Sequence, residues 1–161
     1  MRRSLRLGSV VALALLLTGC PSPPTHTAEH IVPGFGYADV DRIEVYTYRY
    51  AGSPSDVRLS VLTDRREIAT WVDYLTDLPA SPANLGTDTL VGADADGFRF
   101  HLRDGSTWEV THLFCSFSCE GGPQNTLVWP DGTVQATDYG SPSGLTGTPV
   151  DAAERPKAVV G

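Results

Sequence analysis

The sequence has little positive charge and no long hydrophobic run. Its 12 basic residues comprise 11 arginines and a single lysine, Lys157, against 19 acidic residues. This acidic balance argues against nucleic acid as a partner. The most apolar stretch, Leu7 to Leu17, contains about a dozen residues, which is too short to span a bilayer of roughly 30 Å as a helix. No internal repeat is visible.

Catalytic signatures are also missing. The sequence has no G-x-S-x-G, no H-E-x-x-H and no P-loop, and its one G-x-G (Gly34 to Gly36) is not placed between a strand and a helix. Two of the four histidines, His26 and His30, lie in a segment that reads as a tether. We therefore expect no enzymatic activity and no cofactor.

The amino-terminal residues form an ordered set of signals. A basic head containing Arg2, Arg3 and Arg6 is followed by the apolar run and then by Leu17-Thr18-Gly19-Cys20. A basic head, a short apolar run and small residues are typical of a secretory signal. The last four residues resemble the lipobox of bacterial lipoprotein precursors. The alternatives are an ordinary signal peptide with an unrelated cysteine, or an uncleaved membrane anchor.

The lipobox resemblance implies a location. It implies that residues 1–19 are removed and that Cys20 carries the lipid, so the partner would be a bacterial cell membrane and the chain would face its extracytoplasmic side. Nine basic and 19 acidic residues would remain, a side-chain balance of −10, so basic residues would not assist attachment. A diacylglyceryl group supplies two acyl chains, which suffice for stable attachment.

Composition divides the rest of the chain into three parts. Residues 20–38, rich in proline, threonine, histidine and glycine, read as a flexible tether. Residues 39–138 have the length and pattern of a small domain. Residues 139–161 are rich in glycine, proline, serine and threonine without a burial pattern, and we expect a disordered tail.

Hydrophobic periodicity predicts the elements of the domain. Arg42–Tyr50 and Val57–Leu62 alternate as strands separated by a turn. A helical face then follows, with Asp64 as its cap and Pro79 as its stop. Its apolar residues recur at helical spacing: Ile68, Trp71, Val72, Leu75 and Leu78.

Two further hairpins are predicted with their register. A three-residue loop, Arg103-Asp104-Gly105, places Phe100 opposite Trp108, Phe98 opposite Val110 and Arg99 opposite Glu109. A similar loop at Pro130-Asp131-Gly132 places Val128 opposite Val134. The order predicts an α+β fold, in which one antiparallel sheet built from hairpins carries a single amphipathic helix on one face.

Cys115 and Cys119 suggest two kinds of site. An exported domain lies where disulfides persist, so we expect these two cysteines to be bonded to each other across a turn. The alternative is copper or another metal held by His112, Cys115 and Cys119; the C-x3-C spacing resembles that of Sco-type copper-delivery proteins, whose thioredoxin-like fold does not fit the pattern here. His101 and His112 fall on opposite faces of their hairpin, which argues against a ligand role for His101.

Tyr46, Tyr48 and Tyr50 share one face of the first strand, because side chains two residues apart point the same way. Large, stiff side chains with polar tips suit a binding surface. The alternative is that they pack beneath loops or against the second hairpin. Phe117, in the loop between the two cysteines, is a second candidate contact.

The sequence therefore predicts a lipid-anchored lipoprotein whose small non-catalytic domain binds a protein, a peptide or an envelope component. One alternative is an inhibitor of a secreted hydrolase, in which the loop bearing Phe117 would enter a cleft. The other is metal handling through His112, Cys115 and Cys119.

Overall fold

The computed structural model describes residues 34–50, 54, 56–76, 81–82, 92–114, 125–129, 131–137 and 144–157. In this part of the chain, one antiparallel sheet and one α-helix, α1 (Arg65–Thr76), give an α+β fold, as the sequence predicts. Tyr37–Asp39 and Ala152–Glu154 form short 3-10 helices. The strands are β1 (Val40–Arg49), β2 (Arg58–Leu62), β3 (Ser81–Pro82), β4 (Asp94–Leu102), β5 (Thr107–Phe114), β6 (Asn125–Val128), β7 (Val134–Ala136) and β8 (Thr148–Pro149).

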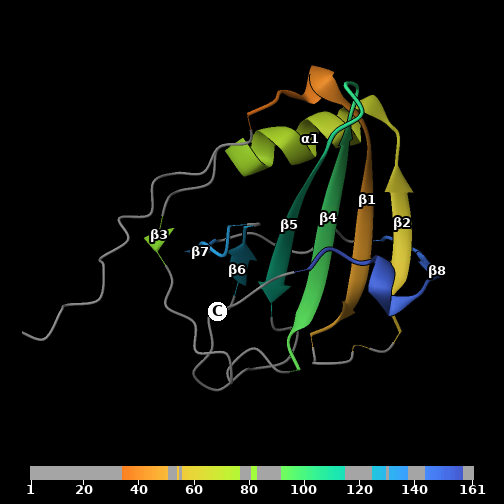
Figure 1. The fold of residues 1–161 in the computed structure, drawn as a ribbon, viewed down its shortest axis with the longest axis vertical. Helices are drawn as coiled ribbons and strands as arrows, with labels where there is room; N and C mark the ends of the chain where they lie inside the picture. Colours follow the sequence, from red (N-terminus) through yellow and green to blue (C-terminus); the bar gives the residue numbers. More distant parts are fainter. Residues whose placement is uncertain are drawn as a thin grey trace, which may run out of the picture.

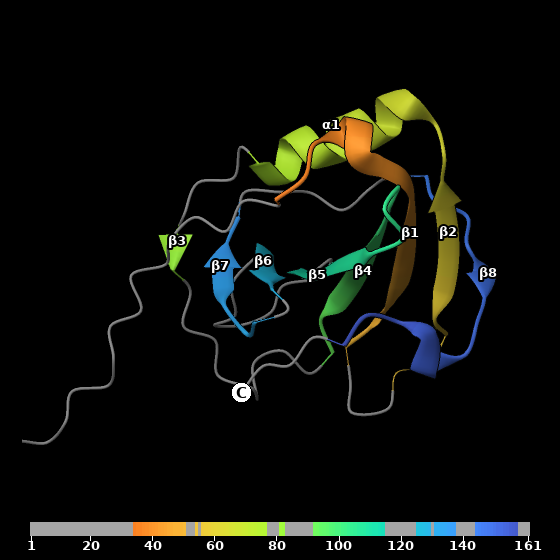
Figure 2. The same ribbon diagram turned by 45° about the horizontal axis from the view of Figure 1, so that its top comes forward.

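The eight strands lie in the order β3-β7-β6-β5-β4-β1-β2-β8. The sheet curves strongly, and α1 crosses one end of it (Figures 1 and 2). The long central strands β1, β4 and β5 are joined by the most extensive pairing, and the two outermost strands have two residues each. Short edge strands, one of them containing Pro82, leave little unpaired backbone for another chain to join.

The predicted hairpin registers are confirmed. Phe98 pairs with Val110 and Phe100 with Trp108, which places large apolar side chains together on one face. Gly105 in the connecting loop has a φ of 88°, a left-handed value that glycine adopts without strain. In the next hairpin, Val128 pairs with Val134 as predicted.

The start of α1 is also confirmed. The Asp64 side chain accepts hydrogen bonds from the backbone N–H groups of Arg66 (2.9 Å) and Glu67 (3.1 Å), which would otherwise lack helical partners. The predicted last apolar position, Leu78, and the predicted stop, Pro79, lie outside the described residues.

One face of the sheet, which we call the helix face, carries the larger apolar cluster. Ile68, Val72 and Leu75 of α1 are buried in this cluster together with residues of β1, β4, β5 and β6. Its sheet residues include Ile43, Val45, Phe98, Phe100, Val110 and Leu127. The ring of Trp71 lies 4.6 Å from that of Phe98, centroid to centroid.

The boundary predicted for the tether differs from the structure. Phe35 belongs to the predicted tether of residues 20–38, yet its ring lies 5.6 Å from Phe100 and 5.4 Å from Trp108. A single apolar residue among prolines and glycines gives no period from which burial can be predicted. The folded part of the chain therefore begins before residue 39.

The predicted disordered tail is wrong for residues 144–157. Thr148 and Pro149 form β8, which pairs with Leu59 and Arg58 of β2. The chain passes around this edge, because Leu145 packs against the cluster on the helix face whereas Val150 and Ala152 pack on the opposite face. Figure 1 shows the segment after β8 crossing in front of β1 and β4. The domain therefore extends well beyond residue 138.

Candidate functional site

The face of the sheet opposite α1, which we call the tyrosine face, carries the most extensive polar network that the structure describes. The register places Tyr46 beside Leu59 of β2 and beside Gly97 of β4. One step toward the loop between β4 and β5, the next row contains Val61, Glu44, Arg99 and Glu109. The face therefore has an apolar half around Tyr46 and Tyr48, and a charged half around Glu44, Arg99 and His101.

Glu44 lies at the centre of the charged half. Its Oε1 lies 2.8 Å from His101 Nε2, and its Oε2 accepts a hydrogen bond of 2.8 Å from the Tyr46 hydroxyl. Arg99 Nη1 lies 3.3 Å from the same Oε2. Burial acts to raise the pKa of Glu44, but hydrogen bonds from His101, Tyr46 and Arg99 outweigh it, so this pKa is lowered.

Arg99 joins the groups around Glu44 to its neighbours. Arg99 Nε donates to Glu109 Oε1 at 2.7 Å, and Arg99 Nη1 donates to the Tyr46 hydroxyl at 2.7 Å. Burial and the hydrogen bond to Glu44 raise the pKa of Tyr46 to about 12, so its hydroxyl stays protonated at neutral pH. Each nitrogen of Arg99 thus has a partner, because Nη2 donates to the carbonyl of Glu154 at 2.8 Å.

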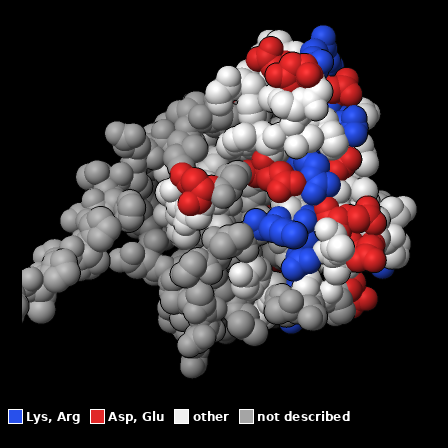
Figure 3. All heavy atoms as spheres, in the orientation of Figure 1, with Lys and Arg blue, Asp and Glu red and all other residues white. Residues whose placement is uncertain are grey.

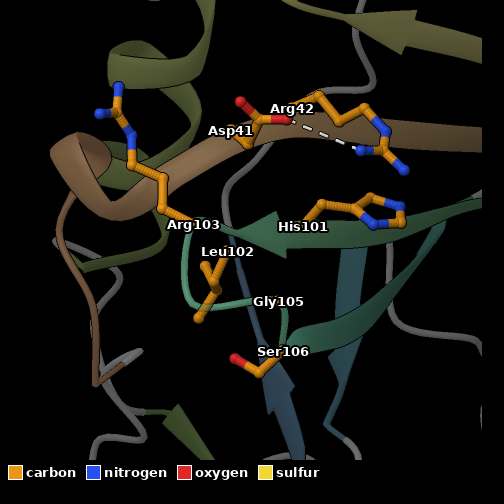
Figure 4. Close-up of a pocket in the computed structure, with 7 residues that line it drawn as sticks. All are labelled: Asp41, Arg42, His101, Leu102, Arg103, Gly105 and Ser106. Carbon is orange, nitrogen blue, oxygen red and sulfur yellow. Dashed lines mark ion pairs between the residues drawn. The ribbon is translucent and has the colours of Figure 1, made fainter.

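A surface hollow of about 510 Å³ adjoins the charged half. Its lining consists of Asp41, Arg42, His101, Leu102, Arg103, Gly105 and Ser106. Figure 4 shows Arg42 and His101 on one side of the hollow, whereas Arg103 points away from them. Arg42 has only long ion pairs, 3.7 Å to Asp41 and 3.7 Å to Glu44. Its guanidinium is therefore more available to a ligand than that of Arg99.

The hollow does not bring a nucleophile to a base. Ser106 Oγ donates to Asp104 Oδ1 at 2.6 Å, and Figure 4 shows it pointing away from His101. The imidazole of His101 is held instead by Glu44. This arrangement of donors and acceptors suits recognition of a polar group, which needs fewer convergent side chains than bond breaking does.

The tyrosine stripe is not the exposed surface that the sequence predicts. Tyr46 is 2% exposed and Tyr48 is 7% exposed, and Tyr50 is partly buried beside them. The apolar half is covered by Val150 and Ala152 from the carboxy-terminal segment. The stripe thus packs beneath a segment of the chain, which is the alternative that its spacing leaves open.

His112 lies on the helix face, opposite His101 on the tyrosine face, as the hairpin parity predicts. It is fully buried, and its Nδ1 lies 3.8 Å from Oδ2 of Asp96, its cross-strand neighbour. Within the described ranges, no three His, Cys, Asp or Glu side chains lie close enough to hold a metal ion. Cys115, Phe117 and Cys119 lie outside these ranges, so the disulfide, the metal site and the Phe117 contact stay predictions.

Charges of both signs lie close together on the tyrosine face. Figure 3 shows basic and acidic atoms interspersed over the described part of this face, without a broad area of one sign. The pairing of Glu44, Arg99 and Glu109 across three strands accounts for part of this pattern. The face therefore presents individually placed charged groups rather than a broad field of one sign.

Sequence reasoning found some members of this network and missed the rest. The pairing of Arg99 with Glu109 follows from the hairpin register and is confirmed. Glu44 shares a face with Tyr46 by the same alternation, but its pairing with His101 depends on the register between β1 and β4, which are distant in sequence. A charged residue in the middle of an apolar alternating strand is the signal that points to such a network.

Comparison with known proteins adds no relative, since no protein family, curated protein or solved structure matches the chain. None of the helices in the described ranges has the length and apolar character needed to cross a membrane.

Proposed function

We propose that the chain is a lipid-anchored lipoprotein that holds a non-catalytic binding domain on the extracytoplasmic side of a bacterial membrane. The observation that carries this proposal is the order of a basic head, a short apolar run and Leu17-Thr18-Gly19-Cys20. Two acyl chains on Cys20 hold a protein at a bilayer without a membrane-spanning helix, because each buried methylene contributes about 0.8 kcal/mol.

The binding role is supported by the tyrosine face. Its charged half presents Arg42 and His101 beside a hollow of about 510 Å³. Its apolar half already holds a segment of polypeptide against Tyr46 and Tyr48. A face on which a polypeptide segment already packs against aromatic side chains, beside an arginine at a hollow, suits contact with a protein or peptide.

Lipid attachment is tested by labelling. The full-length chain and a Cys20→Ser variant are produced in a bacterium that processes lipoproteins and is grown with labelled palmitate. We expect label and a mass increase on the wild-type chain, whose first residue is Cys20, and neither on the variant. Cys115→Ser serves as the matched control and keeps the label.

The proposal fails if the wild-type chain carries no label, or if the Cys20→Ser chain carries as much as the wild type. In either case the thiol of Cys20 is not the site of attachment. The lipobox resemblance would then be fortuitous.

A further inference from the structure

The carboxy-terminal strap, which we define as residues 147–157, docks on the sheet by strand addition. Thr148 and Pro149 pair with β2, and the backbone N–H of Val150 donates to the carbonyl of Val57 at 3.0 Å. Arg58 Nη1 donates to the carbonyl of Gly147 at 3.0 Å. These contacts use the backbone of the strap and fix its direction along the edge of the sheet.

Beyond β8, side chains hold the strap across the tyrosine face. Val150 and Ala152 pack into the apolar half. The guanidinium carbon of Arg155 lies 5.4 Å from the centroid of the Tyr48 ring, a distance at which a cation is attracted to an aromatic face. The carbonyl of Glu154 accepts the hydrogen bond from Arg99 Nη2 at 2.8 Å.

Pro156 fits against the sheet only because residue 97 lacks a side chain. A Cβ atom built on Gly97 would lie 2.9 Å from Pro156 Cδ and 3.1 Å from its Cγ. Gly97 lies within β4, where glycine weakens a strand and often marks the close approach of another backbone. Gly97 therefore lies at the point where Pro156 of the strap crosses β4.

Strand addition at an edge, followed by pockets for particular side chains, is how many domains recognise extended peptides. We propose that the residues contacted by the strap form a recognition site, the strap site, for an extended segment of a partner protein. The segment it fits has small apolar side chains followed by arginine and proline, and residues 147–157 occupy the site in cis. This inference rests on the proposed binding function, and it specifies both the binding site and the kind of peptide segment that binds there.

Because the strap occupies the strap site in cis, a partner segment must compete with it for binding. A segment tethered to its own site experiences an effective concentration on the order of millimolar. A partner segment with the same contacts therefore competes poorly unless it makes additional ones. The hollow beside Arg42 and His101 lies on the same face and provides a place for such contacts.

The test uses a fluorescent peptide with the sequence of residues 147–157 and two full-length chains in detergent. One chain is the wild type, and the other carries Arg155→Ala with Pro156→Gly, which weaken the strap and leave the strap site intact. We expect the peptide to bind the variant at least ten-fold more tightly than the wild type. A peptide with Arg155→Ala should bind at least five-fold more weakly, since it lacks the contact with Tyr48.

Two substitutions in the variant background provide a matched pair. Gly97→Ala should abolish peptide binding because the new methyl group occupies the place of Pro156. Gly34→Ala should leave it unchanged, because a Cβ there meets nothing within 4 Å. If the variant does not fold, exchange of the Val150 amide in the wild-type chain is measured with and without excess peptide, and we expect the peptide to accelerate it.

Two outcomes overturn the inference. The first is no peptide binding to a folded variant, or no effect of the peptide on Val150 exchange in the wild type. The second is a complex in which the strap of the Gly97→Ala chain binds the strap site of the strap-weakened chain, together with dimers of the wild-type chain formed in the same way. That outcome would make a second copy of this chain the occupant of the strap site. Neither outcome touches the attachment of lipid to Cys20, which the labelling experiment tests separately.

Discussion

Glu44 shows how hydrogen bonds and charged neighbours stabilise a largely buried carboxylate on a sheet. Its side chain is 15% exposed, and three neighbours from β1 and β4 provide hydrogen bonds or charge to its two oxygens. Ionisation of a largely buried group is unfavourable without such partners. The network therefore stabilises the fold only while Glu44 is charged.

The lowered pKa of Glu44 predicts a pH-dependent stability. Since this pKa is lower in the folded than in the unfolded chain, the contribution is present above the ordinary value of 4.5 and is lost as pH falls through the lowered value. Glu44→Gln should reduce the free energy of unfolding at pH 7 by about 1–3 kcal/mol. It should also flatten the loss of stability below pH 5, as urea denaturation at a series of pH values would show.

Asp73→Asn serves as the control for Glu44→Gln, because Asp73 is an exposed acidic residue of α1. An equal flattening in both variants would mean that the network around Glu44 is not its source.

At the scale of elements, the strap is the part whose position depends on one small residue. Its backbone pairs with β2, and its Pro156 crosses β4 at Gly97. Alanine at position 97 remains compatible with a strand, so the sheet itself should tolerate it. The strap, in contrast, must move away from the sheet.

Gly97→Ala should therefore release the strap while the sheet stays folded. We expect hydrogen exchange at the Val150 amide to increase at least ten-fold, because its bond to the Val57 carbonyl is lost. Amides in the pairing of β4 with β5 should be little affected. Unchanged exchange at Val150 would show that the approach of Pro156 to Gly97 does not hold the strap.

The elements that sequence predicts well are those held by local pattern. The alternation of Phe98, Phe100, Trp108 and Val110, together with the three-residue loop, favours this register, because a shift by one residue puts apolar side chains opposite charged ones. The strap has no such pattern. Val150 and Ala152 are partly buried and Pro156 is buried, but mostly exposed residues separate them, and each packs against a surface formed elsewhere in the chain.

At the scale of the whole molecule, both faces of the sheet are covered, each in a different way. On the helix face, Ile68, Val72 and Leu75 of α1 are buried in one cluster with residues of the sheet. The tyrosine face is divided, with its apolar half covered by the strap and its charged half open beside the hollow. The candidate site could not be predicted as it stands, because alternation places Tyr46 and Glu44 on one face without showing which part of that face is covered.

A chain ending at residue 138, the boundary that composition suggests, should consequently be unstable. Loss of Val150, Ala152 and Pro156 from the tyrosine face should reduce the free energy of unfolding by roughly 3–5 kcal/mol. Circular dichroism should show a melting temperature lower by roughly 10 °C or more, with increased binding of an apolar dye. A chain ending at residue 157 is the control and should melt like the full-length protein; equal melting of both chains would contradict the prediction.

Because the strap passes around the β2 edge and covers the apolar half of the tyrosine face, it can dock only after the strands that it contacts have been made. Residues 147–157 follow the strands that they cover in sequence, so the aromatic surface beneath them stays in contact with water until this segment has been made. A purification tag fused after Gly161 would be attached close to the strap. The stability and peptide binding of such a tagged protein should therefore be compared with those of the untagged protein.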